Sequence, residues 1–180
     1  CIFAKKGLTN RTIEVMVTII GAGNVAWHLA KGFEAVGINV NTVYSRKIAD
    51  AETITDELYH AEATNSLDFS ESESELFVLA VSDNAIQSVA KKLVLPPEAT
   101  LVHTSGATPL AILEDIYDDL PDVTCGVFYP LMTFTKYKYM DLSEIPFCVE
   151  ATEPPIEKYL LNIAKKISAK AQVISSEQRL

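Results

Sequence analysis

The chain has 180 residues, enough for one well-buried domain and part of a second. Of these residues 48% are hydrophobic and 22% charged, a composition typical of a globular protein. Its net charge of −9, with no basic run longer than a pair, argues against nucleic acid or an anionic membrane as a partner. No apolar run approaches the roughly 18 residues that span a bilayer, and no secretory signal is evident. We therefore expect a cytoplasmic protein that acts on a small molecule.

The cysteines are odd in number, and neither metal-ligand nor C-x-x-C spacing relates them. We interpret Cys1, Cys125 and Cys148 as reduced thiols, expect the last two in or beside strands, and predict no metal site. Residues 1–15 read as an N-terminal extension, because Met16 stands where the first strand begins.

A β-branched run over residues 15–20 ends at Gly21, and Gly23 and Ala26 follow with the G-x-G-x-x-G/A spacing of a dinucleotide-binding βαβ unit. Gly21 permits the tight turn, Gly23 lets the backbone approach a pyrophosphate, and Ala26 lets the helix pack closely. Apolar residues at helical spacing continue to Gly37, a suitable C-terminal cap. The alternative is a tight turn that binds nothing. The predicted cofactor-binding positions here are Gly21, Gly23, Asn24 and Val25.

Residues 38–44 alternate as a second strand, and Ser45 and Arg46 follow it. NAD-preferring units carry a carboxylate at this place, which would repel a 2′-phosphate. A hydroxyl and a guanidinium would instead bind that phosphate, with about 1.5–3 kcal/mol for a charge-assisted hydrogen bond. The sequence thus favours NADP, unless Arg46 and Lys47 simply begin a solvated helix.

A helix over 47–59 and a short strand over 60–64 come next, and the apolar run 76–81 predicts a central strand. Ser82 and Asp83 follow that strand. They either cap the next helix or lie beside the ribose of the cofactor at the carboxyl edge of the sheet.

A strand over 100–103 opens into residues 104–109. His103 has an ordinary pKa near 6.5, which suits proton transfer, and Ser105 could orient a carbonyl, imine or carboxylate. The alternative is a structural histidine, with Thr104 or Ser105 as a cap. We expect a helix over 108–119 and a strand over 123–128. Tyr129, after that strand, is either a second acid or an aromatic of the core.

The remaining elements predicted are a strand over 145–150, a helix over 155–169, a strand over 171–174 and the capped start of a helix over 175–180.

Five motifs taken together indicate a family. They are Gly21–Ala26, Tyr44–Arg46, Ala80–Ile86, Val102–Gly106 and Phe128–Phe134. This set resembles bacterial Rossmann-like proteins with a C-terminal domain of unknown function, labelled NADP oxidoreductase, coenzyme-deazaflavin-dependent type. It is more distantly similar to pyrroline-5-carboxylate reductase, prephenate dehydrogenase and the β-hydroxyacid dehydrogenases.

The resemblance implies an α/β fold with a doubly wound, mostly parallel sheet. Residues 16–130 would form the NADP-binding Rossmann domain, and 131–180 would lead into a helical domain absent from this chain. That domain would close the active site and form a homodimer. In the dehydrogenase relatives, strand ends matching His103–Gly106 and Tyr129–Pro130 flank the nicotinamide and the substrate.

Two functions follow as hypotheses. The first is an NADP(H)-dependent oxidoreductase that transfers a hydride to or from a small carbonyl or imine, with His103, Ser105 and Tyr129 as proton donors or orienting groups. The second is a non-catalytic NADP(H) sensor. This hypothesis rests on the sequence having no lysine at the strand ends where the dehydrogenase relatives place their catalytic acid.

Overall fold

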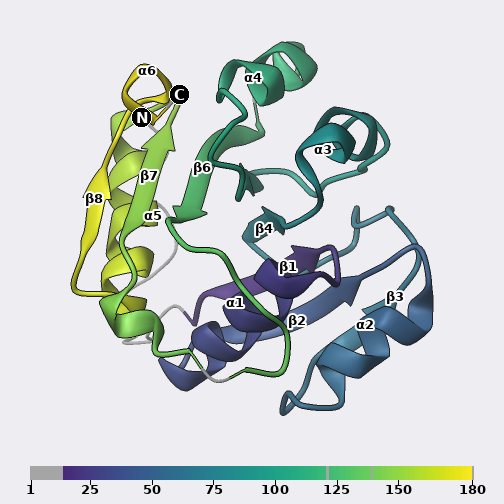
Figure 1. Ribbon diagram of the computed structural model, residues 1–180. Coiled ribbons are helices and arrows are strands. Elements are labelled where there is room, and N and C mark those ends of the chain that lie inside the picture. Colours follow the sequence, from purple (N-terminus) through teal and green to yellow (C-terminus); the bar gives the residue numbers. More distant parts are fainter. Residues whose placement is uncertain (1–13, 121, 139, 180) are drawn as a thin grey trace, which may run out of the picture.

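The computed structural model describes residues 14–120, 122–138 and 140–179, and it is built on an eight-stranded sheet of order β3-β2-β1-β4-β5-β6-β7-β8 (Figure 1). Neighbouring strands pair in parallel except β6 and β7, which are antiparallel. The predicted doubly wound, mostly parallel α/β sheet is therefore confirmed. The strands are β1 Met16–Ile20, β2 Asn39–Tyr44, β3 Glu62–Thr64, β4 Leu76–Leu79, β5 Thr100–His103, β6 Thr124–Pro130, β7 Phe147–Ala151 and β8 Ala171–Val173.

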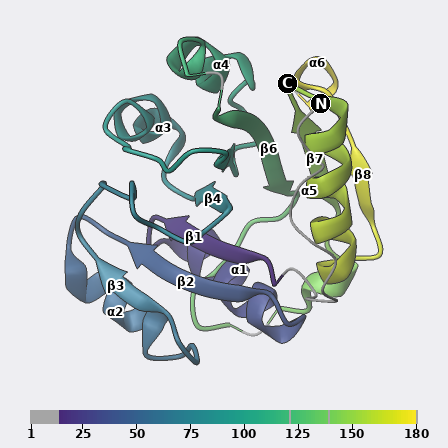
Figure 2. The same cartoon turned by 180° about the vertical axis from the view of Figure 1, so that it is seen from behind.

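Helices cover both faces of the sheet. Buried side chains of α1, α2 and α5 belong to one hydrophobic cluster, and those of α3 and α4 belong to a second cluster on the other face. The opposite views in Figures 1 and 2 show α1 first in front of β1 and β2 and then behind them. The helices are α1 Asn24–Ala35, α2 Ile48–Thr55, α3 Asp83–Ala90, α4 Ala111–Tyr117, the short 3-10 helix η1 Leu142–Glu144, α5 Pro154–Ile167 and α6 Ser176–Arg179.

The central strands are buried because helices lie over both of their faces. Every residue of β4 and β5 is buried, as the continuous apolar run over 76–81 predicts for a parallel strand. Helix α1 ends with Val36 as its cap, and Gly37 adopts φ +77°, the left-handed conformation expected of a C-terminal glycine.

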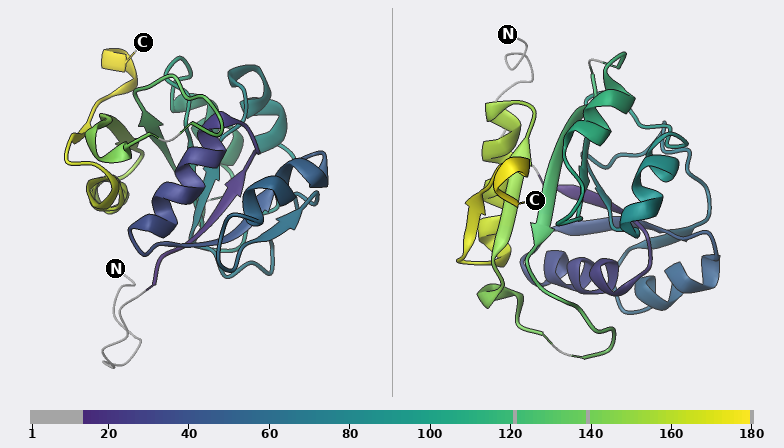
Figure 3. Two further views of the ribbon diagram at one scale, coloured as in Figure 1. Left: turned by 60° about the horizontal axis from the view of Figure 1, so that its bottom comes forward. Right: turned by 45° about the horizontal axis from the view of Figure 1, so that its top comes forward.

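The strand order reverses between β1 and β4, so the chain turns away from this point in both directions. In open α/β sheets, ligands bind outside the carboxyl ends of the strands at such a switch point. The six parallel strands β1–β6 end on one edge of the sheet, and Figure 3 shows the same elements from two further directions. Every site residue predicted from sequence lies at, near or just beyond the carboxyl end of one of five of these strands.

Several boundaries differ from the predicted ones. Helix α4 begins at Ala111 rather than near 108, because the preceding residues form a hydrogen-bonded turn. Strand β6 continues through Pro130 because its last two residues pair with β7. The second helix and third strand are shorter than predicted, as are α5 and β8. Most of the predicted N-terminal extension, residues 1–13, lies outside the described residues.

Candidate functional site

The loop between β1 and α1 brings two glycines to the switch point for different reasons. Gly21 adopts φ +125°, and a Cβ there would overlap the carbonyl oxygen of Ala80 at the end of β4. Its N–H donates to the Tyr44 carbonyl (2.9 Å), which holds the loop against β2. Gly23 instead has φ −83°, and a Cβ there would meet nothing within 4 Å. The fold therefore needs a glycine at position 21 but not at position 23.

Helix α1 starts at this loop, with Gly23 in its N-cap position. The N–H groups of Gly23, Asn24 and Val25 donate no hydrogen bond to any other described residue, as expected for the first turn of a helix. Gly23 and Asn24 are exposed, so these donors and the positive end of the helix face open space. Such a turn can receive an anionic group such as a pyrophosphate.

A segment between β6 and β7, which we call the crossing segment (residues 131–137), passes in front of α1 in Figure 1. The Asn24 side-chain amide donates to the Phe134 carbonyl (2.9 Å), and His28 Nε2 lies 2.9 Å from the Thr135 carbonyl. Lys136 Nζ lies 3.5 Å from the Ala22 carbonyl. The Asn24 side chain therefore donates one hydrogen bond within the chain itself, and its backbone N–H, which donates to no described residue, can serve a cofactor.

The predicted 2′-phosphate site lies one strand away, at the end of β2. The Ser45 N–H donates to the Thr64 carbonyl (3.0 Å), which fixes the backbone there, and Ser45 is half-buried. Arg46 and Lys47 are exposed, and neither forms an ion pair with another described residue. Lys47 is the N-cap residue of α2, so these cations also begin a helix. The geometry is thus compatible with both of the alternatives considered from the sequence.

At the end of β4, Ser82 is the N-cap residue of α3, one of the roles considered from the sequence. Its side chain makes no capping hydrogen bond to a described residue, and Asp83 is already the first helical residue. The Asp83 carboxylate interacts favourably with the helix dipole from there. It also lines a pocket at the carboxyl edge of β5 and β6, so it lies where a ligand could contact it.

His103, the last residue of β5, is fully buried. Its Nδ1 accepts a hydrogen bond from the Ser105 N–H (3.2 Å), which puts the proton of the neutral ring on Nε2, and Nε2 finds no hydrogen-bond partner among the described residues. Burial, and after it the charge of Arg179, lower the pKa of His103 to about 4, against smaller opposing effects of the Pro109 carbonyl, Glu150 and Asp83. The pKa of His103 therefore lies below the ordinary value near 6.5 that suits proton transfer at neutral pH. The imidazole is neutral at neutral pH.

Ser105 is buried and closes a tight turn. Its hydroxyl donates to Thr108 Oγ1 (2.9 Å) and accepts from the Ala107 N–H (3.1 Å). These bonds stay within the turn, and Ser105 does not cap α4, whose N-cap residue is Leu110. Because the hydroxyl proton is used inside the turn, Ser105 can orient a substrate only if that turn rearranges.

Tyr129 lies against the same turn from the neighbouring strand. A Cβ on Gly106 would lie 2.5 Å from Tyr129 Cζ, so the glycine makes room for the ring. The pocket here has a volume of about 500 Å³, and Asp83, Thr104 and Tyr129 contribute polar groups to its wall. The structure therefore brings Tyr129 together with residues 103–106, as predicted. Leu131 and Met132 beside them are exposed, whereas Phe134 is buried in the core.

Arg179 also lines this pocket, and the sequence analysis did not single it out. Its side chain is only 3% exposed and contacts both the turn after β5 and Glu150 of β7. The motif after the last strand predicted a helix start and nothing more. An arginine in the last positions of a polar stretch gives no local signal of burial, because its partners lie 29 and 71–74 residues earlier.

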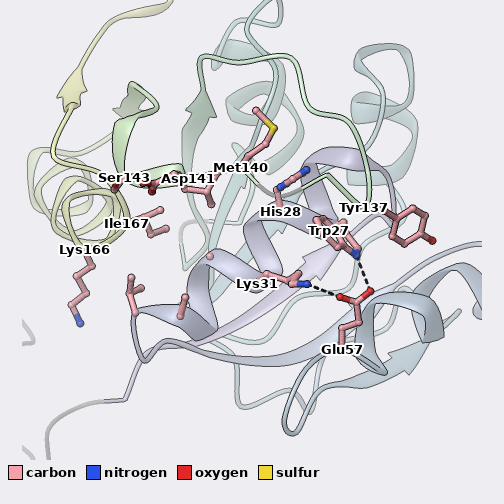
Figure 4. A pocket seen from close by; sticks show the side chains of 14 residues that line it. Trp27, His28, Lys31, Glu57, Tyr137, Met140, Asp141, Ser143, Lys166 and Ile167 are labelled. Atoms are coloured by element: carbon pink, nitrogen blue, oxygen red, sulfur yellow. Dashed lines mark hydrogen bonds and ion pairs between the residues drawn. The ribbon is translucent and has the colours of Figure 1, made fainter.

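A second, larger groove of about 720 Å³ lies along the flank of α1, away from the strand ends (Figure 4). Trp27 and Lys31 both point to Glu57 there, with Trp27 Nε1 donating to Oε1 (3.3 Å) and Lys31 Nζ to Oε2 (2.6 Å). Tyr137 packs edge-on against Trp27. Lys31 and Glu57 pair with each other, whereas Asp141 and Lys166, which also line the groove, form no ion pair with another described residue. The groove shares no residue with the glycine loop.

Cys125 and Cys148 are buried in β6 and β7, as predicted, and form no disulfide. Burial raises the pKa of Cys125 to about 12 and also raises that of Cys148. Within residues 14–120, 122–138 and 140–179, no three His, Cys, Asp or Glu side chains are grouped so as to hold a metal ion. No helix in the same described ranges has the length and hydropathy needed to cross a bilayer.

A glycine loop at the switch point of a doubly wound sheet, with free helix N–H groups beside it, defines an α/β domain of the nucleotide-binding type. The chain belongs to the Rossmann-like domain family, which matches its sequence over residues 5–121. No curated protein gives a significant match. The resemblance inferred from the sequence motifs is therefore confirmed at the level of the fold family.

Solved structures agree with this assignment. A provisionally named NADP oxidoreductase from Bacteroides fragilis is 32% identical, with 92% of this chain covering 62% of that chain at a TM-score of 0.81. Prephenate dehydrogenase from A. aeolicus, in complex with hydroxyphenyl propionate and NAD+, is 17% identical (97% and 63% covered, TM-score 0.75). A reductive aminase from Aspergillus terreus, with NADPH and ethyl-5-oxohexanoate, is 14% identical (89% and 55% covered, TM-score 0.68). The chain thus spans less than two thirds of each.

Proposed function

We propose that this chain is the cofactor-binding part of an NADP(H)-dependent oxidoreductase that transfers a hydride to or from a small carbonyl or imine substrate. The observation that carries the proposal is the open space at Gly23. Nothing in the described protein comes within 4 Å of a Cβ at this position, and its φ of −83° suits any residue. A glycine that the fold does not require leaves its space to a ligand, and the unpaired N–H groups beside it suit a pyrophosphate.

The end of β2 supports NADP as the cofactor rather than NAD. Ser45 and Arg46 stand where a carboxylate would repel the 2′-phosphate, and the exposed Arg46 guanidinium has no partner among the described residues to compete with that phosphate. The name of the Bacteroides fragilis protein and the NADPH in the reductive aminase complex point the same way. The aminase also motivates the imine as a substrate class.

The pocket at the ends of β5 and β6 would receive the nicotinamide and the substrate. The cofactor would supply the hydride, and the protein would fix the geometry and supply a proton to the carbonyl oxygen or imine nitrogen. Tyr129 is the proton donor we favour, because its hydroxyl end lies at the pocket wall against Gly106. His103, neutral and buried, would act through the turn that it orders rather than as a charged acid.

Calorimetric titration of NADPH and NADH tests this proposal on wild type, Arg46→Ala and Gly23→Ala. We expect NADPH to bind more tightly than NADH. Arg46→Ala should lower the ratio of the NADPH affinity to the NADH affinity about tenfold, the equivalent of one charge-assisted hydrogen bond. Lys47→Ala is the matched control, because Lys47 is an equally exposed cation one position further along. A wild-type chain that binds neither dinucleotide contradicts the proposal.

A non-catalytic NADP(H) sensor is the second candidate. The observation that favours it is the burial of His103, because a solvent-excluded neutral ring cannot deliver a proton as an imidazolium. The two candidates differ in Tyr129→Phe. In the enzyme this change should lower substrate-dependent NADPH oxidation at unchanged NADPH affinity, whereas a sensor would oxidise no NADPH with any carbonyl or imine offered.

A further inference from the structure

The guanidinium of Arg179 is tied to the turn that follows β5. Its Nη1 donates to three backbone carbonyls, those of Ser105 (2.9 Å), Gly106 (3.1 Å) and Thr108 (2.9 Å). These carbonyls therefore all face a single nitrogen of a side chain that lies more than 70 residues later. The contact pins the turn in one shape.

The charge of Arg179 is balanced inside the protein. Its Nη2 lies 3.3 Å from Glu150 Oε2 and donates to Ser176 Oγ (3.0 Å), while the Ser176 hydroxyl donates to the same carboxylate oxygen (2.7 Å). Ser176 Oγ also accepts from the Leu110 N–H (3.0 Å) at the start of α4. The Arg179 Nε is buried and has no hydrogen-bond partner in the part of the chain that the structure describes. With both Nη groups engaged and Nε inaccessible, Arg179 is a cross-link rather than a ligand for an anion.

The pinned turn in turn places Tyr129. Gly106, whose carbonyl Arg179 holds, lies so close to the Tyr129 ring that a Cβ would come within 2.8 Å of the hydroxyl oxygen. The turn also contains the Ser105 N–H that holds His103. Any shift of the turn would therefore move the ring that forms the wall of the pocket.

We propose that Arg179 is a positioning residue of the pocket at the ends of β5 and β6. By holding the carbonyls of Ser105, Gly106 and Thr108, it fixes the turn and thereby the Tyr129 ring. This inference rests on the proposed function, in which that pocket receives the nicotinamide end of the cofactor. The predicted 2′-phosphate site lies three strands away, at roughly 4.8 Å per strand, so it should not depend on Arg179.

The test compares two ligands in Arg179→Lys, which keeps the charge beside Glu150 but replaces the planar fork by one nitrogen. Adenosine 2′,5′-bisphosphate probes the adenosine end alone, and NADPH probes both ends. We expect the bisphosphate to bind within about twofold of wild type, and NADPH to bind about tenfold more weakly with a smaller rise in nicotinamide fluorescence. A double variant, Arg179→Gln with Glu150→Gln, removes both charges together and should bind the two ligands as Arg179→Lys does. Lys170→Met, which breaks the exposed Lys170–Glu144 pair, is the control and should change neither ligand.

Equal weakening of both ligands would overturn the positioning role in favour of a general loss of stability, and unchanged binding of both would overturn it outright. If the wild-type chain binds neither ligand, the proposed function fails instead. Hydrogen exchange of the ligand-free protein then decides the inference by itself. Faster exchange of the Ser105 and Ala107 amides in Arg179→Lys supports it, and unchanged exchange there contradicts it.

Discussion

Gly21 and Gly23 lie two residues apart in one loop, yet alanine should affect them in opposite ways. At Gly21, φ is +125° and the added Cβ would overlap the Ala80 carbonyl oxygen and lie 2.8 Å from its carbon. Both obstacles are backbone, so they cannot move aside as a side chain can. Left-handed strain of about 1–3 kcal/mol and overpacking of a similar size sum to about 4 kcal/mol of lost stability.

At Gly23 the added Cβ meets nothing within 4 Å, and φ is already suitable for alanine. A slightly poorer N-cap and a less flexible unfolded chain act in opposite directions, so the free energy of unfolding should change by no more than about 0.5 kcal/mol. The methyl group does occupy the space proposed for the pyrophosphate. NADPH should therefore bind at least about tenfold more weakly to Gly23→Ala.

Urea unfolding and calorimetry on the two variants separate these effects. With a urea dependence of about 2 kcal/mol per molar, Gly21→Ala should unfold at a midpoint about 2 M below wild type, and Gly23→Ala at the wild-type midpoint. Wild-type affinity for NADPH in Gly23→Ala would refute the assignment of this loop to the pyrophosphate. A wild-type midpoint for Gly21→Ala would refute the close approach of β4.

Three further predictions concern single side chains. The pKa of His103 is about 4 in the folded state against about 6.5 in the unfolded chain, so between these values only the unfolded chain binds the proton. The free energy of unfolding should therefore be highest above pH 6.5 and fall by about 3 kcal/mol as the pH drops to 4. His103→Asn should remove this pH dependence in urea titrations. Asn24→Ala should lower the free energy of unfolding by about 1 kcal/mol, because the Phe134 carbonyl loses its donor, but leave NADPH affinity within about twofold. Cys125 should react with a thiol reagent only as fast as the protein unfolds, as followed by mass spectrometry, because it is buried and burial raises its pKa.

Each of these has an outcome that contradicts it. A pH dependence that persists in His103→Asn would assign the acid sensitivity to other groups. A large loss of NADPH affinity in Asn24→Ala would mean that the side chain, rather than the backbone, holds the phosphates. Labelling of Cys125 much faster than global unfolding would show local opening of β6.

The sheet and the glycine loop could be predicted from the sequence because their signals are local. A buried β-branched run, two glycines and a helical stripe follow one another within residues 15–37, and each constrains the next. The strand ends could also be placed together, because parallel strands share one carboxyl edge. His103 and Tyr129 were found in this way, at the end of β5 and near the end of β6.

Properties that depend on distant contacts could not be predicted. The pKa of His103 is set chiefly by burial, which no pattern around residues 100–109 reports. The roles of Asn24 and Arg179 depend on carbonyls 110 and 71–74 residues away. A carbonyl is present at every residue, so the sequence gives no hint of which one a side chain will find.

The crossing segment also has a consequence for the permitted length of the chain. Tyr129 is fixed at one end by its pairing with Cys148 in β7, and Phe134 and Thr135 are fixed at the other by Asn24 and His28 of α1. A deletion between Pro130 and Phe134 would separate one end from its partners, because the shortened backbone could not span the same distance. Related sequences should therefore not shorten this interval, and most length variation should instead lie beyond the exposed Tyr137.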